Sequence, residues 1–94
     1  MKLELILSSD EIRSQIPFLL IWEVWTCNSG TGRFRRLVES YFEKSEMEDI
    51  EKLVRQARQW SVVKIPDEVR LSWHTRMLWE KLTEFCGLVC RQVR

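Results

Sequence analysis

The clearest structural signal in the sequence lies between Met47 and Trp60, where apolar residues recur with the spacing of an α-helix. They are Met47, Ile50, Leu53, Val54, Ala57 and Trp60. Acidic residues come early in this segment and basic residues late, which is the order that the helix dipole favours. Ser45 and Glu48 have the spacing of a capping box, so we expect the helix to begin at Ser45. Because a helix with one apolar face must bury it, this segment predicts the centre of a packed core.

The N-terminal residues predict a half-buried β-strand followed by a short helix. Leucines alternate with polar residues in the period of a strand, at Leu3, Leu5 and Leu7. Ser8 and Glu11 form another capping box, and we expect the helix that they open to end near Pro17. Residues 61–72 predict two short extended pieces around a turn at Pro66-Asp67, and the first strand can pair with either piece.

Two more segments carry helical apolar stripes. The first runs to about Lys44 and consists of Phe34, Leu37, Val38, Tyr41 and Phe42. The second follows Ser72, a candidate N-cap, and consists of Leu78, Leu82, Phe85, Cys86 and Val89, with Gly87 as a candidate early end. The sequence therefore predicts one domain, residues 1–94, of the α+β class. It is mainly helical, with about four helices and a small two- or three-stranded β-sheet that includes the N-terminal strand.

The longest apolar run, Ile16–Cys27, is open to two interpretations. Phe18, Trp22 and Trp25 recur at helical spacing, which favours a helix. The aromatic and β-branched content leaves a buried strand as the alternative. A membrane span needs roughly 20 apolar residues, and this run is shorter and contains Glu23, so we expect a core element and no membrane anchor.

Composition narrows the class of partner and the compartment. Fifteen Lys and Arg residues against fourteen Asp and Glu give a net charge of +1, so an attraction to nucleic acid or to a membrane would need a local basic patch. The three cysteines have no disulfide-framework spacing, and no signal peptide is recognisable. We therefore expect reduced thiols and a cytoplasmic protein.

The sequence offers no strong metal or catalytic signature. His74 and Cys86 are twelve residues apart, which on a continuous helix corresponds to about 18 Å, too far for two ligands of one zinc ion. Nothing places Cys27 near His74, and no motif for an oxyanion hole is present. We expect a protein without enzymatic activity, metal or cofactor, in which Cys86 and Cys90 act as small hydrophobic residues.

The segment CNSGTGRFRR, residues 27–36, breaks a local rule. Arg33, Arg35 and Arg36 fall at the start of a predicted helix, where the dipole favours acidic residues. One interpretation is a site for a phosphate or carboxylate at the exposed helix start. The other is a corner between helices, in which Asn28 or Gly30 supplies a left-handed residue and Thr31 caps the next helix.

Five tryptophans are many for a chain of 94 residues, and tryptophan and arginine are common at protein interfaces. We expect a non-enzymatic protein-binding module: a small regulator, an inhibitor or a subunit of a larger complex. In it, Trp60, Trp73 or Trp79 inserts into an apolar pocket of the partner, and Arg33, Arg35 and Arg36 contact acidic groups. The alternative is a DNA- or RNA-binding regulator in which the arginines contact phosphates. Self-association as a homodimer is a further expectation.

Overall fold

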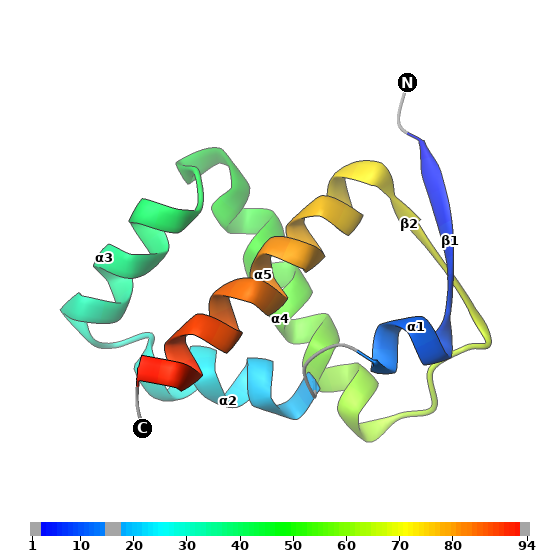
Figure 1. Cartoon of the computed structure of the whole chain (residues 1–94), viewed down its shortest axis with the longest axis horizontal. Helices are drawn as coiled ribbons and strands as arrows, with labels where there is room; N and C mark the ends of the chain where they lie inside the picture. Colours follow the sequence, from blue (N-terminus) through cyan, green and yellow to red (C-terminus); the bar gives the residue numbers. More distant parts are fainter. Residues whose placement is uncertain (1–2, 15–17, 93–94) are drawn as a thin grey trace.

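Helices form most of the molecule, and a two-stranded ribbon closes one end of it (Figure 1). The computed structural model describes residues 3–14 and 18–92. In chain order the elements are β1 (Glu4–Ser8), α1 (Ser9–Arg13), α2 (Phe18–Asn28), α3 (Gly32–Tyr41), the 3₁₀ turn η1 (Lys44–Glu46), α4 (Met47–Val62), β2 (Glu68–Ser72) and α5 (Trp73–Gln92). The predicted α+β class, with a sheet that includes the N-terminal strand, is confirmed.

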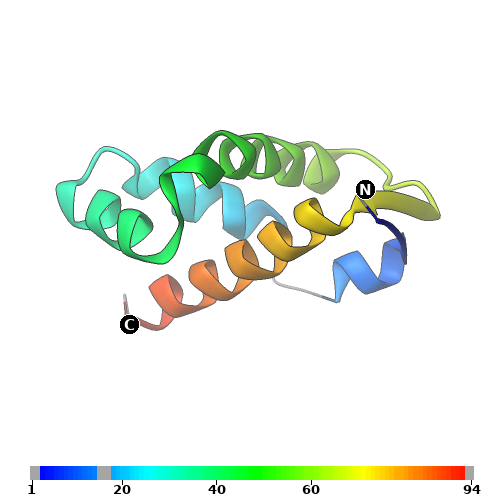
Figure 2. The same ribbon diagram turned by 90° about the horizontal axis from the view of Figure 1, so that it is seen from above.

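Three helices make the core, because α2 packs against both α4 and α5, which also contact each other. Figure 2 separates α4 and α5, which overlap in Figure 1. Ile21, Ile50 and Leu82, one from each helix, are fully buried. The helical interpretation of the long apolar run is confirmed for Phe18–Asn28, and Ile16 and Pro17 lie outside the described residues.

The ribbon pairs β1 with β2 in antiparallel orientation. Leu5 lies opposite Leu71, and Leu7 lies opposite Val69, so these four side chains share one face of the ribbon. Of them, Leu7, Val69 and Leu71 pack on the helical core. The first of the two extended pieces predicted after Trp60 begins later than expected, at Val63, and does not join the sheet. Residues 61–62 belong to α4, whose last turn is closed by a hydrogen bond from the Val63 N–H to the Gln59 C=O at 2.9 Å. Helical hydrogen bonding therefore overrides the local strand preference of the valines.

Three of the predicted caps are present. The hydroxyl oxygens of Ser8, Thr31 and Ser72 each accept a hydrogen bond from the backbone N–H three residues later, at 3.1, 3.2 and 3.2 Å. Such caps satisfy backbone donors that a helix start leaves free.

The predicted cap at Ser45 is wrong. Ser45 lies inside η1, because the Glu46 carboxylate accepts a hydrogen bond from the Glu43 N–H at 3.0 Å and lies 3.4 Å from the Lys81 ammonium. These contacts hold a tighter turn, and α4 begins only at Met47.

Two predicted helix ends are also shifted. The helix expected to reach Lys44 ends at Tyr41. Gly87 does not end α5, which continues to Gln92. A glycine inside a helix costs about 1 kcal/mol, and burial of the neighbouring Cys86 and Val89 offsets that cost.

The corner between α2 and α3 forms without a left-handed residue. No residue in the described part of the chain has a positive φ angle, so the expectation that Asn28 or Gly30 supplies one is wrong. Instead the Thr31 N–H donates to the Asn28 C=O at 2.9 Å, and the Asn28 side chain donates to the Val24 C=O at 2.7 Å. Polar side chains and a short turn reverse the chain here.

The two ends of the molecule differ in how they join the core. At one end, α3 contacts α5 through aromatic rings: Phe34, Tyr41 and Phe42 surround Phe85 with ring centroids 5.3 to 5.7 Å away. At the other end, the two strands pair with each other through their backbones, and the ribbon contacts the helical core through its leucine face. In Figure 1 the helices α2, α4 and α5 lie between these ends.

Candidate functional site

The structure separates the six residues that the sequence suggested as a binding site. Arg33, Arg35 and Arg36, here called the arginine corner, lie on α3 at one end of the molecule (Figure 1). Trp60 lies in the last turns of α4, and Trp73 begins α5 beside the ribbon. The arginines and these tryptophans therefore do not form one continuous site.

Most of the tryptophans are used in packing. Trp79 is only 1% exposed and contacts Trp60 edge to face, with ring centroids 5.5 Å apart. Its indole N–H has no hydrogen-bond partner among the described residues. Trp22 lies under the Arg58 guanidinium at 4.8 Å, and Trp25 packs edge to face on Phe34 at 5.5 Å. The large number of tryptophans is thus mainly a property of the core, and Trp79 is not accessible to a partner in this conformation.

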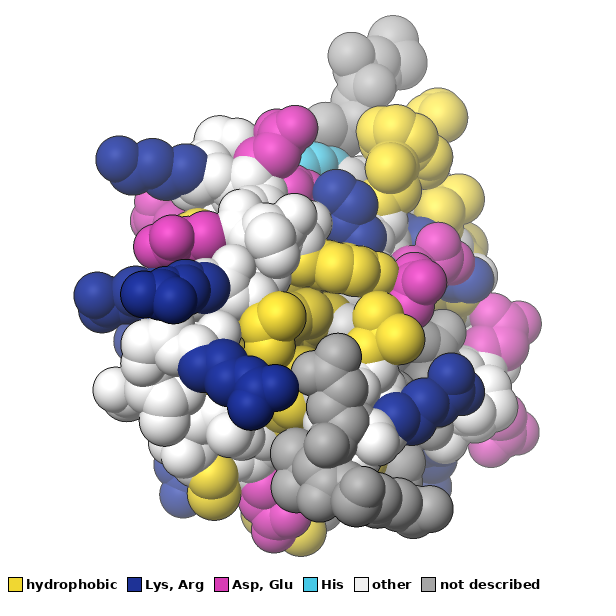
Figure 3. Space-filling view, turned by 60° about the vertical axis from the view of Figure 1, so that its left-hand side comes forward, with side chains coloured by type: hydrophobic (Ala, Val, Ile, Leu, Met, Phe, Trp, Pro, Cys, Tyr) yellow, Lys and Arg dark blue, Asp and Glu magenta, His cyan; other side chains and the backbone are white. Residues whose placement is uncertain are grey.

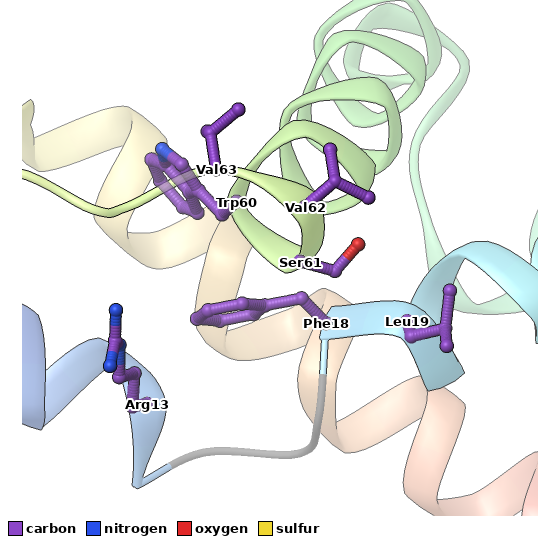
Figure 4. Close-up of a pocket in the computed structure, with 7 residues that line it drawn as sticks. All are labelled: Arg13, Phe18, Leu19, Trp60, Ser61, Val62 and Val63. Atoms are coloured by element: carbon purple, nitrogen blue, oxygen red, sulfur yellow. The ribbon is translucent and has the colours of Figure 1, made fainter.

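A groove of about 470 Å³ opens beside Trp60 (Figure 4). We call it the Trp60 groove, and it is lined by Arg13, Phe18, Leu19, Trp60, Ser61, Val62 and Val63. The rings of Phe18 and Trp60 are 5.8 Å apart, and Arg13 faces them from α1. Its volume lies within the range typical of ligand pockets, and most of its lining is apolar.

The rim of the Trp60 groove exposes apolar side chains to an unusual extent. Leu19 is 50% exposed, Val62 74% and Val63 56%. The apolar stripe of α4 ends at Trp60, so Val62 and Val63 are not needed to complete its buried face. The sequence predicts an extended segment at Val62 and Val63, which conceals their place on the rim of the groove. An apolar pair just beyond the last position of a helical stripe is the signal that identifies them.

The arginine corner is fully on the surface. All three arginines are exposed, and none forms an ion pair within residues 3–14 and 18–92. Figure 3, which brings the α3 side forward, shows Lys and Arg side chains around a central hydrophobic area. Arg35 also lines a second groove of about 630 Å³, whose other charged residues are Glu39, Lys44 and Glu51. Cations are therefore available here, but carboxylates accompany them in the groove.

A second exposed apolar group lies where β1 meets α5. Trp73 is 52% exposed, and its backbone N–H donates to the Leu3 C=O, which brings these two residues together. Met77 follows one helical turn after Trp73 and is also exposed. We call Leu3, Trp73 and Met77 the ribbon end.

Two side chains that could take part in acid–base or thiol chemistry, Cys86 and His74, are held in structural contacts. Burial raises the pKa of the Cys86 thiol to about 12, with a smaller contribution from Cys90, so Cys86 stays protonated near neutral pH. The His74 Nε2 atom lies 3.2 Å from Asp49 Oδ2. Within the described ranges, no group of three or more His, Cys, Asp and Glu residues is placed to hold a metal ion.

Comparison with known proteins gives no relative: no family model, curated protein or solved structure matches the chain. The described helices include none that is both long and apolar enough to cross a membrane.

Proposed function

We propose that the protein is a non-enzymatic protein-binding module, a small regulator, inhibitor or subunit of a larger complex, that contacts its partner at the Trp60 groove. The observation that carries this proposal is the exposed apolar rim formed by Leu19, Val62 and Val63 around the rings of Phe18 and Trp60. Contiguous exposed apolar surface of this kind marks interaction sites in soluble proteins. We expect the module to act in the cytoplasm, because free cysteines are typical of reducing compartments.

The sequence predicts that a tryptophan of this protein inserts into a pocket of the partner, whereas the shape of the groove favours the reverse arrangement. Trp60 is half-buried and forms a wall of the groove, so the partner supplies the inserted side chain. Arg13 is the charged residue of the lining and forms no ion pair among the described residues. An apolar side chain flanked by a carboxylate, which can pair with Arg13, is the complementary chemistry.

The exposed rim supplies part of the free energy of binding. Complete burial of a Val or Leu side chain contributes about 1.5–3 kcal/mol, and the rim residues are roughly half exposed before binding. Covering Leu19, Val62 and Val63 therefore contributes on the order of 3 kcal/mol, in addition to contacts in the groove. Trp73, at the ribbon end, stays a prediction as a separate contact point.

The test is a double substitution on the rim, Leu19→Asp with Val62→Asp. Because both side chains are at least half exposed, the fold should be retained, as circular dichroism can verify. The partner is recovered from the native cell, identified by mass spectrometry, purified and titrated against each form. We expect its Kd to rise at least tenfold, which corresponds to about 1.4 kcal/mol.

The control is Leu88→Asp, which places one carboxylate at an exposed apolar position on α5, and it is compared with Leu19→Asp and Val62→Asp as single variants as well as with the double variant. The control should bind like the original protein. Equal affinity of the rim variant and the control would show that the partner binds elsewhere.

The second candidate function is binding of DNA or RNA through the arginine corner. Three exposed arginines without an ion pair in the described part of the chain are the observation that favours it. Contacts to phosphates make affinity fall steeply with salt, with a log–log slope of roughly −0.9 per contact for duplex DNA. Replacing the arginines with glutamine should flatten that slope, and a slope that does not change excludes this function for the corner.

A further inference from the structure

The outer edge of β1 carries backbone groups that the ribbon does not use. In an antiparallel pair, alternate residues exchange hydrogen bonds with the partner strand, and the residues between them direct their N–H and C=O groups outward. The Trp73 N–H donates to the Leu3 C=O, and the Ser9 N–H donates to the Asp67 C=O at 3.1 Å. With the observed register, these bonds show that the odd-numbered residues of β1 direct their backbone N–H and C=O groups toward β2. Glu4 and Ile6 therefore present both their N–H and their C=O groups to the outer edge, whereas Ser8 presents its N–H there and uses its C=O to begin α1.

The side chain at the centre of this edge is apolar. Ile6 is the middle residue of β1, and it is 57% exposed on the face opposite the leucines. Proteins commonly protect an exposed strand edge with a charge, a proline or a covering segment. Ile6 gives no such protection. The helix α1 lies beside the Ser8 end of β1, but no other described strand pairs with this edge (Figures 1 and 2).

The other edge of the ribbon is protected. Arg70 lies opposite Ile6 and occupies the middle of β2, so its backbone faces the outer edge of that strand. If β2 paired with a copy of itself about its middle, two arginines would stand directly opposite each other. Like charges in opposing positions destabilise a strand pair. The two edges therefore differ in their capacity for self-pairing, and only the β1 edge is compatible with it.

We propose that two copies of the chain associate through their β1 edges, antiparallel about Ile6, to form a four-stranded sheet in the order β2-β1-β1-β2. The two Ile6 residues exchange both of their backbone hydrogen bonds, and their side chains contact each other on the exposed face. Glu4 of each copy lies opposite Ser8 of the other, so no carboxylate faces a carboxylate.

The same geometry selects the register. A pairing centred on Glu4 would place two carboxylates opposite each other, and a shift by one residue would direct inward-facing backbone groups at the partner. The register about Ile6 is the one that places the middle residue of each β1 strand opposite its copy, where both backbone groups point outward. A five-residue edge buries less area than a typical permanent interface, so the dimer is of micromolar affinity.

The proposal is tested in the full chain by placing a charge at Ile6, the residue that lies opposite its own copy in the proposed dimer. Ile6→Lys and Ile6→Glu each place like charges opposite one another in the homodimer. Sedimentation at about 100 µM, well above a micromolar Kd, should give dimers for the original protein and monomers for either variant alone. An equimolar mixture of the two variants should form dimers again, because the introduced lysine and the introduced glutamate then face each other only in the proposed register.

Two controls separate this interface from the Trp60 groove. Val62→Lys adds a charge to the groove rim and should leave the dimer intact, whereas loss of the dimer in this variant would assign self-association to the groove. Circular dichroism establishes that both Ile6 variants are folded. The proposal is overturned if the original protein is monomeric at about 100 µM, or if mixing the two folded variants does not restore the dimer.

Discussion

The consecutive helices α3 and α4 begin with opposite charge patterns. The first turn of α4 contains Glu48 and Asp49, which complement the helix dipole, whereas the arginine corner places cations at the start of α3. In compensation, α3 has the Thr31 side-chain cap, and α4 has no side-chain cap. Stability alone accounts for the charges of α4. It does not account for those of α3, and residues that break a local rule are frequent at functional surfaces.

The largest expected effect concerns the packing of α3 against the core. Because α3 reaches α5 through the rings around Phe85, Phe85→Ala should lower the free energy of unfolding by about 3–5 kcal/mol. Urea denaturation measures this change. The control is Leu88→Ala on the same helix, where the exposed side chain should cost far less. Similar losses in the two variants would mean that α3 is not held mainly by the aromatic cluster.

The predicted caps of the two helices, Thr31 and Ser45, should differ in their contributions to stability by an intermediate amount. Thr31→Ala removes a hydrogen bond to the Phe34 N–H and should lower the free energy of unfolding by about 1 kcal/mol. Ser45→Ala should change it by less than about 0.5 kcal/mol, because Ser45 caps no helix in the structure. Thermal unfolding of both variants distinguishes them. A larger loss at Ser45 than at Thr31 would favour the capping box that the sequence suggested.

The smallest expected effect is electrostatic and has opposite signs in the two helices. Replacing Arg33, Arg35 and Arg36 with glutamine should leave stability unchanged or raise it by about 0.5 kcal/mol, because it removes cations that oppose the dipole. On α4, Lys52→Gln should lower the free energy of unfolding by about 0.3 kcal/mol, since Lys52 Nζ lies 3.7 Å from Glu48 Oε1. Both changes are read from melting curves at low salt. A clear loss of stability in the arginine variant would instead indicate that the arginine stems pack against the surface.

Local patterns in the sequence predicted the elements whose causes are local. The stripe from Met47 to Trp60 became α4, and the leucine alternation became β1. The caps at Ser8 and Thr31 follow from neighbouring residues alone. These features require no knowledge of distant contacts, which is why the fold class could be predicted.

Distant contacts explain what the sequence did not predict. Ser45 is no cap because Glu46 is held by Lys81, which lies 35 residues further along the chain. The burial of Trp79 depends on Phe18 and Trp60 from two other helices. The Trp60 groove likewise combines residues of α1, α2 and α4, so its position could not be read from any single segment.

The contact between Trp60 and Trp79 also gives the molecule an optical property. Two indole rings with centroids 5.5 Å apart and planes at 73° are close enough for their excited states to couple, and such coupling appears as a paired band in the far-ultraviolet circular dichroism spectrum. One ring of the pair lines the groove, and the other is shielded inside the core. An occupant of the groove changes the surroundings of only one chromophore and so alters the coupled signal. The protein therefore contains its own label-free reporter of whether the groove is filled.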